Sequence, residues 1–84
     1  MTTGQILIVD DEKHTRDGLS ELLIEAGYKV IPAANGYQAW DIVTSELPDI
    51  VLADLKMPGM DGLQLLRKIK EYNPDIPVIV ITAH

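Results

Sequence analysis

Acidic side chains follow two apolar runs of this 84-residue chain, and a hydroxyl side chain lies near the end of a third. Asp10 and Asp11 come directly after the run QILIV, Asp54 follows IVLA, and Thr82 lies in IPVIVITAH. Carboxylates that lie close together repel one another, which raises the pKa of at least one of them unless a cation is bound. Hard oxygen ligands with an open face suit Mg²⁺, which keeps several of its waters. The acids therefore predict a divalent cation together with a phosphorylated group.

The acids can converge only if the apolar runs are neighbouring strands of one sheet. Short runs, most of them rich in β-branched residues, predict four strands, over residues 5–9, 28–34, 49–54 and 76–84. Apolar side chains at helical spacing predict three intervening helices, over residues 13–26, 36–45 and 62–72. This alternation predicts an α/β fold with a parallel sheet covered by helices on both faces. Ligands of such sheets bind beyond the carboxyl ends of the strands, which is where these acids lie.

Single residues indicate where some of these elements begin and how they pack. Asp61 is a residue type that caps helix N-termini, so it is expected to start the third helix. In that helix, Leu63, Leu66 and Ile69 are predicted to face the core. Pro32 lacks a backbone N–H, which predicts an edge position for the second strand.

Composition excludes several classes of protein. The net charge of −6 argues against a nucleic-acid surface. The absence of cysteine excludes a disulfide framework and thiolate metal sites, and it fits a reducing compartment. The N-terminal MTTGQ is unlike a signal peptide, and the apolar runs are too short to span a bilayer. We therefore expect one small cytoplasmic domain that contacts neither nucleic acid nor membrane directly.

Three motifs resemble the receiver domain of two-component response regulators. They are ILIVDDE, DIVLADLKMPGMDG and PVIVITA, and the resemblance runs from about Gln5 to the last residue. The middle motif, an Asp followed by x-x-Met-Pro-x-x-x-Gly, is highly specific for that family. The resemblance implies a flavodoxin-like (CheY-like) doubly wound parallel sheet with strand order 2-1-3-4. It also implies that residues 1–84 form the N-terminal two-thirds of a receiver domain.

The resemblance implies a role for each acid of the site. Asp54 matches the aspartate that accepts a phosphoryl group from a sensor histidine kinase. Asp10 and Asp11 match the acids that hold Mg²⁺ together with it, and Lys56 matches the position whose backbone carbonyl completes the metal site. Such a domain is a phosphoacceptor, with at most self-catalysed phosphotransfer and autodephosphorylation, and is not an enzyme acting on a separate substrate.

The resemblance also implies roles outside the metal site. Thr82 matches a switch hydroxyl that moves toward the phosphorylated aspartate, and Ala83 matches a small residue that leaves room for the phosphoryl group. Pro58 and Gly62 match residues that shape the loop after the acceptor. Details such as Gly-Leu and VIVITAH are most similar to regulators whose output includes a σ54-type ATPase. The resemblance implies an output domain in the parent protein, either DNA-binding or such an ATPase, and a role in transcription regulation.

The family fold has five strands, whereas this sequence predicts four. The last strand and the last two helices are expected to be absent, and no lysine of this sequence matches the lysine that the family carries on its fifth strand. The fourth strand would then be an exposed apolar edge, which invites pairing with another chain. We therefore expect self-association through this edge.

Two other functions are compatible with part of this pattern. A truncated fragment that serves assembly or dimerisation, without competent phosphotransfer, stays open. A phosphatase of the haloacid dehalogenase type also uses an aspartate at a strand end with Mg²⁺, but it carries a second aspartate two residues later. That position is Lys56 here, which disfavours the phosphatase.

Overall fold

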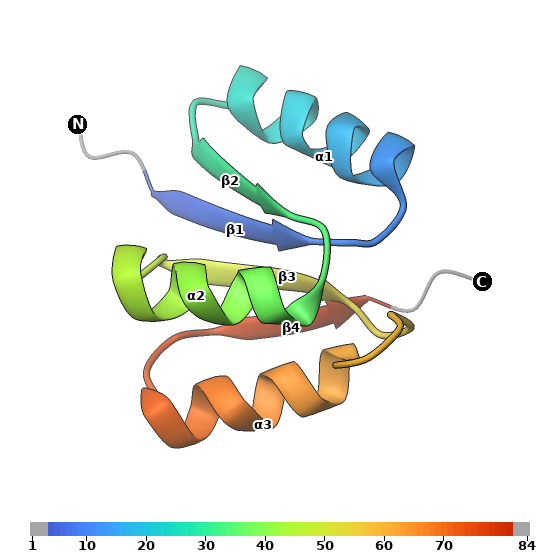
Figure 1. Ribbon diagram of the computed structural model, residues 1–84. Coiled ribbons are helices and arrows are strands. Elements are labelled where there is room, and N and C mark those ends of the chain that lie inside the picture. Colours follow the sequence, from blue (N-terminus) through green and yellow to red (C-terminus); the bar gives the residue numbers. More distant parts are fainter. Residues whose placement is uncertain (1–3, 82–84) are drawn as a thin grey trace.

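Strands and helices alternate along the whole described part of the chain (Figure 1). The structure is a computed structural model, and it describes residues 4–81. The elements in chain order are β1 (Gln5–Val9), α1 (Lys13–Glu25), β2 (Lys29–Ala33), α2 (Gly36–Glu46), β3 (Ile50–Asp54), α3 (Gly62–Tyr72) and β4 (Val78–Ile81). The predicted α/β order is confirmed.

The strands form one parallel sheet in the order β2-β1-β3-β4. This confirms the predicted strand order, and it confirms the edge position of β2, where Pro32 lies. In the register, Val9 pairs with Ala53 and Asp54 pairs with Ile81. The carboxyl ends of β1, β3 and β4 are therefore level with one another, and the order reverses between β1 and β3, where such sheets bind ligands.

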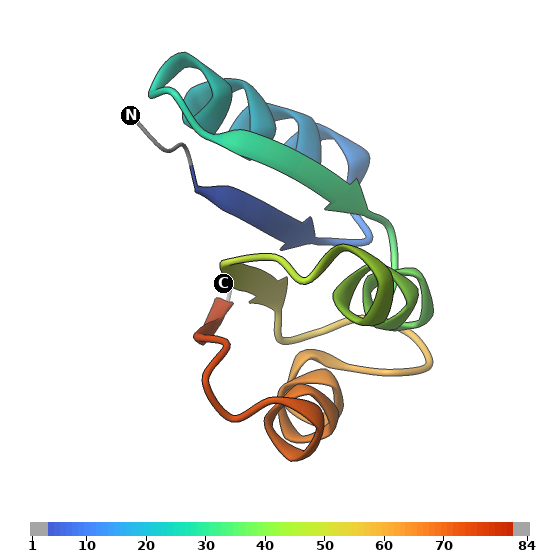
Figure 2. The same ribbon diagram turned by 90° about the vertical axis from the view of Figure 1, so that its left-hand side faces the viewer.

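The two faces of the sheet are covered unequally. Alternate strand residues, among them Leu7, Val9 and Val51, are buried in one core with residues of α2 and α3. Figure 2 shows α2 and α3 side by side along the sheet, whereas α1 lies against β2 and β1 (Figures 1 and 2). On the α1 side, Ile79 is 48% exposed and Ile81 40% exposed, so β4 is only partly covered among the described residues.

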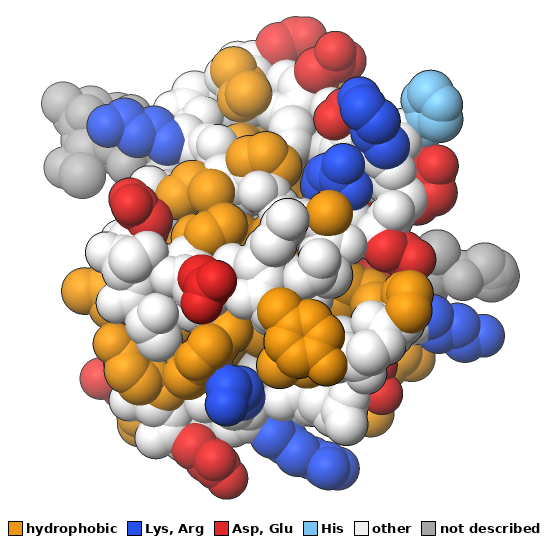
Figure 3. Space-filling model, in the orientation of Figure 1, with side chains coloured by type: hydrophobic (Ala, Val, Ile, Leu, Met, Phe, Trp, Pro, Cys, Tyr) orange, Lys and Arg blue, Asp and Glu red, His pale blue; other side chains and the backbone are white. Residues whose placement is uncertain are grey.

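Helices α2 and α3 are joined by an aromatic contact at the surface. The rings of Trp40 and Tyr72 meet edge to face with 5.4 Å between their centroids. The Lys68 ammonium lies 4.6 Å from the centre of the Trp40 ring, which adds a cation–π attraction. Hydrophobic side chains gather over these two helices in Figure 3, and they keep α2 and α3 packed as one layer.

The core-facing side of α3 differs from the predicted one. Leu65 and Ile69 are fully buried, whereas Leu63 is 47% exposed and Leu66 is only half-buried. Buried Gly62 starts the same stripe, because positions 62, 65 and 69 follow helical spacing. The close contact of Gly62 with the end of β3 sets the rotation of the helix. The prediction was therefore correct for Ile69 and wrong for Leu63.

The helices have lengths typical of a small globular domain. No helix within residues 4–81 combines the length and the apolar character needed to cross a membrane.

The burial difference within α3 gives a direct test of this packing. Leu65→Ala should lower the free energy of unfolding by about 2–5 kcal/mol, because it opens a cavity in the core. Leu63→Ala, on the exposed side of the same helix, should cost less than about 1 kcal/mol. Urea unfolding followed by far-ultraviolet circular dichroism measures both, and equal losses would contradict the assigned helix rotation.

Candidate functional site

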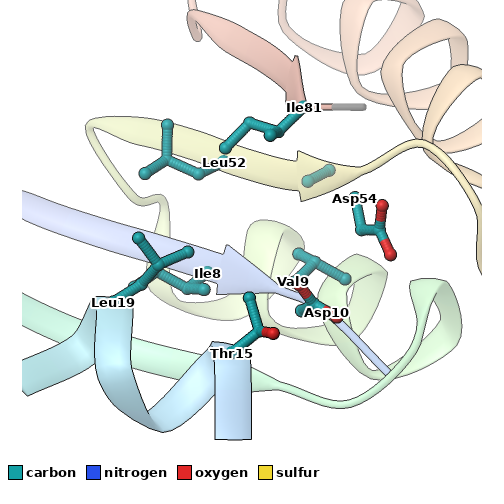
Figure 4. Close-up of a pocket in the computed structure, with 9 residues that line it drawn as sticks. Ile8, Val9, Asp10, Thr15, Leu19, Leu52, Asp54 and Ile81 are labelled. Carbon is teal, nitrogen blue, oxygen red and sulfur yellow. The ribbon is translucent and has the colours of Figure 1, made fainter. Parts of the chain in front are cut away.

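Three carboxylates meet beyond the carboxyl ends of β1 and β3. Asp10 and Asp11 follow β1, and Asp54 is the last residue of β3. One carboxylate oxygen from each of the three lies within 4.8 Å of the other two. In Figure 4, the Asp10 and Asp54 side chains lie close together beyond the ends of their strands. The predicted convergence of the acids is thus present, while their roles as metal ligands and phosphoacceptor stay predictions.

The surroundings of Asp10 in this cluster oppose its ionisation. Burial raises the pKa of Asp10 above its usual value, and the nearby charges of Asp54, Asp11 and Glu12 raise it further. The backbone N–H of Glu12 donates to Asp10 Oδ1 at 2.9 Å, which opposes these effects without cancelling them. The ionised cluster is therefore under repulsion that a bound cation would relieve.

The chemistry of the ligand atoms fits Mg²⁺. The cluster offers carboxylate oxygens, which are the hard ligands that Mg²⁺ prefers, and within residues 4–81 no imidazole or thiolate joins them. Asp11 is exposed and the other two acids are half-buried, so an ion there could keep waters on its open side.

Lys56 lies beside the acceptor through its backbone. Its N–H donates to Asp54 Oδ1 at 3.3 Å, across the turn that leaves β3. The predicted contribution of its carbonyl to a metal site is not tested by these contacts and stays a prediction.

Gly62 brings α3 into direct contact with the end of β3. A Cβ atom at this position would lie 2.5 Å from the carbonyl oxygen of Asp54, so only glycine fits without displacement. The Gly62 N–H donates to the carbonyl of Leu55, and the Leu55 N–H donates to the carbonyl of Ile81, each at 3.0 Å. This close approach explains the loop-shaping role expected of Gly62. Pro58 is exposed in the same loop, and its role stays a prediction.

The start of α2 also packs against the loop between β3 and α3, residues 55–61. A Cβ on Gly36 would lie 2.7 Å from the Cβ of Met60, so the first turn of α2 rests directly on the loop. Gly59 has a φ of +78°, and Tyr37 packs against it. Sequence reasoning missed these supports, and the only signal was a glycine that follows a capping residue.

Helix α1 begins at an acid that sequence reasoning did not assign as a cap. Glu12 is the N-cap, and its carboxylate accepts from the Thr15 N–H at 2.9 Å. This hydrogen bond lowers the pKa of Glu12. One turn on, Arg16 Nη1 donates to the carbonyl oxygen of Asp10 at 2.7 Å. Both contacts tie α1 to the acidic loop.

A small cavity of about 50 Å³ lies next to the acids on the α1 side (Figure 4). Its lining is mostly apolar, from β1, β3, β4 and α1, with Asp10, Thr15 and Asp54 as the polar members. The predicted switch hydroxyl of Thr82 and the small residue Ala83 lie outside the described residues, so their roles are not tested.

Comparison with known families identifies one match that covers nearly the whole chain. The model of the response regulator receiver domain family matches residues 6–84.

Individual relatives and solved structures agree with this match. Sporulation initiation phosphotransferase F of Bacillus subtilis is 49% identical over the whole chain, which spans 68% of its length. The DNA-binding transcriptional regulator NtrC of Escherichia coli is 42% identical over the whole chain, which spans only 18% of its length. The response regulator TrrA of Thermotoga maritima, solved in complex with Mg²⁺-BeF, superposes with a TM-score of 0.94 at 38% identity, covering 98% of this chain and 71% of that one.

The raised pKa of Asp10 predicts a pH-dependent effect of Asp10→Asn on the metal-free chain. Asparagine keeps an acceptor for the Glu12 N–H but carries no charge. Because the folded pKa of Asp10 lies above the ordinary 3.8, ionisation of Asp10 costs the parent stability. The stability of the parent relative to the variant is therefore greatest below pH 3.8 and falls as pH rises through the raised pKa. Asp10→Asn should thus be the more stable protein at pH 7.

Urea unfolding with a chelator present, at several pH values up to 7, measures this difference. Adding Mg²⁺ should stabilise the parent and remove the advantage of Asp10→Asn. A parent that is more stable than the variant at pH 7 without metal would contradict the assigned repulsion.

Proposed function

The chain belongs to the response regulator receiver domain family, and from this premise we propose that it accepts a phosphoryl group on Asp54. The observation that carries the proposal is the meeting of Asp10, Asp11 and Asp54 within 4.8 Å at the ends of two neighbouring strands. A lone acid at a strand end would be explained by turn formation. Three acids that meet at the carboxyl ends of the strands repel one another, which favours a functional explanation.

The chemistry proposed for Asp54 is attack of its carboxylate on a phosphoryl group. The donor is a phosphohistidine of a sensor histidine kinase: its P–N bond breaks as a P–O bond to Asp54 forms. Asp54 is held by the Lys56 N–H at one oxygen and by the packing of Gly62 against its own backbone. These contacts fix the direction of the carboxylate before the donor arrives, which lowers the entropic cost of the reaction.

Asp10, Asp11, Asp54 and the Lys56 carbonyl would hold Mg²⁺ in this proposal. When bound, the ion neutralises charge on the acids and on the phosphoryl oxygens, which makes a weak carboxylate nucleophile competent. The phosphoryl group stays on a side chain of the chain itself. The domain is therefore proposed to act as a signalling phosphoacceptor and not as an enzyme with a separate substrate.

The remaining steps of the proposal concern signal output. Thr82 would respond to phosphorylation as the switch hydroxyl, and Ala83 would leave space for the phosphoryl group. An output domain of the parent protein, one that binds DNA or is a σ54-type ATPase, would then regulate transcription in the cytoplasm. The similarity to NtrC, which is named as a DNA-binding transcriptional regulator, supports this direction.

Self-association is a second candidate function, and one observation favours it. β4 is the outermost strand at its side of the described sheet, and Ile79 and Ile81 are 48% and 40% exposed there. An apolar edge strand of this kind can pair with a second copy. An assembly role without phosphotransfer would use the same strand.

Asp54→Asn tests the phosphoacceptor proposal. Incubated with Mg²⁺ and acetyl phosphate, the parent chain should gain the mass of one phosphoryl group, and Asp54→Asn should gain none because its amide is not a nucleophile. Intact-protein mass spectrometry reads both. The matched control is Asp49→Asn, which removes a carboxylate from the opposite end of β3 and should be phosphorylated like the parent.

Two results would count against phosphoacceptance at Asp54. One is an adduct of equal yield on Asp54→Asn. The other is a parent that forms no adduct with either acetyl phosphate or beryllofluoride, which would favour the assembly role.

Light scattering tests self-association through β4. The mass of the parent should rise toward that of a dimer with concentration, and Ile79→Lys should stay monomeric because it places a charge on the exposed strand. Ile24→Lys, at a 57% exposed position of α1, should associate like the parent. A parent that is monomeric at every concentration would exclude this candidate.

A further inference from the structure

Arg16 is a half-buried cation within an otherwise exposed turn. The neighbouring residues of the first turns of α1 are exposed, whereas Arg16 folds back toward the sheet. Its Nη1 donates to the carbonyl oxygen of Asp10 at 2.7 Å, in a partly buried setting. A charged donor makes a stronger hydrogen bond than a neutral one, so this contact restrains the Asp10 backbone.

Asp10 makes three hydrogen bonds, which connect it to β2 and to the start of α1. Its N–H donates to the carbonyl of Ala33 at the end of β2, at 3.1 Å. Its Oδ1 accepts from the N–H of Glu12, the cap of α1, at 2.9 Å. Its carbonyl accepts from Arg16 on α1. Of the three, the Arg16 contact is the one made to the carbonyl group that joins Asp10 to Asp11.

That carbonyl belongs to the rigid peptide plane that joins Asp10 to Asp11. Fixing the direction of the C=O group fixes the rotation of the plane, and so the positions from which both carboxylates project. Arg16 thereby acts on two of the three acids without contacting either carboxylate.

We propose that Arg16 is a positioning residue that sets the affinity of the acid cluster for Mg²⁺. This inference rests on the proposed function, because it needs the cluster to be the metal site. Residues that orient metal ligands through hydrogen bonds typically change metal affinity by about 10–100-fold when they are lost. Without Arg16, the peptide plane between Asp10 and Asp11 can rotate, and the carboxylates of these two residues are no longer held pointing toward the same place.

The charge of Arg16 has the opposite effect to its position. A cation beside a metal site repels Mg²⁺, so removing the charge alone should tighten binding. Lys13 serves as the control for this effect, because it lies on the same first turn and its Nζ pairs with Asp17, one turn further along α1, at 2.6 Å. Figure 3 shows basic and acidic side chains close together over the start of α1. The two effects thus predict changes of opposite sign.

The experiment is a Mg²⁺ titration of the full chain, followed by NMR through the amide chemical shifts of residues 10–12. Arg16→Ala should raise the Kd for Mg²⁺ about 10-fold or more. Arg16→Lys, which keeps the charge and one donor, should recover most of this loss. Lys13→Ala should leave the Kd unchanged or lower it.

Two further comparisons separate positioning from general damage. Leu65→Ala, a destabilised core variant, should keep the parent Kd wherever it is folded. The Arg16→Ala effect should persist at high salt, where a charge effect would be screened. If Arg16→Ala does not fold, Arg16→Met, which keeps a long side chain but has no donor, takes its place with the same expected rise in Kd.

The results that overturn the inference are distinct from those that overturn the proposed function. A parent that binds Mg²⁺, with Arg16→Ala binding it equally or more tightly, overturns the positioning role alone. A weakening that Leu65→Ala shares also overturns it. A parent that shows no Mg²⁺ binding overturns the metal site, and the positioning role falls with it.

Discussion

Repulsion between three carboxylates at the carboxyl-terminal end of the sheet is the constraint on which the site depends. Parallel pairing of β1 with β3 makes their carboxyl ends level, so Asp10 and Asp54 meet there. Strands could end in neutral residues at no electrostatic cost. This chain instead keeps a charged cluster that burial makes more costly, as the raised pKa of Asp10 records. The fold must hold these acids together against their own field.

Backbone amides oppose part of this repulsion. The N–H of Glu12 donates to the Asp10 carboxylate, and the N–H of Lys56 donates to that of Asp54. A peptide dipole lowers the local repulsion without filling the site with a side-chain cation. Within the described residues these hydrogen bonds use only Oδ1 of Asp10 and Oδ1 of Asp54, so Oδ2 of each remains available for a ligand. Arg16 donates to the backbone carbonyl of Asp10 and not to a carboxylate, in keeping with this arrangement.

Features that depend on chain periodicity could be predicted from the sequence. Alternation of strands and helices predicts a parallel sheet. The family resemblance implies its strand order, and that order brings Asp10 to Asp54. The rotation of α3 could not be predicted as well, because Leu63, Leu65 and Leu66 offer competing apolar stripes. Contact between Gly62 and the Asp54 carbonyl decides among them.

The contacts of Arg16 and Gly36 could not be predicted from the sequence either. An arginine in an acidic, polar turn has no pattern that distinguishes a bond to Asp10 from a solvated position. The closeness of Gly36 to Met60 depends on how a helix and a distant loop meet, which local sequence does not encode. Thr82 and Ala83 lie beyond the described residues, so their assignment still depends on the family resemblance.

The packing around the acceptor loop has a mechanical consequence. On one side, the end of β3 and the loop after it pack against the starts of α2 and α3, where Gly36 and Gly62 leave no space for a methyl group. On the other side lie a cavity of about 50 Å³ and a strand that is only partly covered. The surroundings of Asp54 are thus stiff in one direction and compliant in the other. Volume or charge added to this carboxylate can be accommodated toward solvent, α1 and β4 but not toward α2 and α3, which gives a local chemical event a preferred direction through the domain.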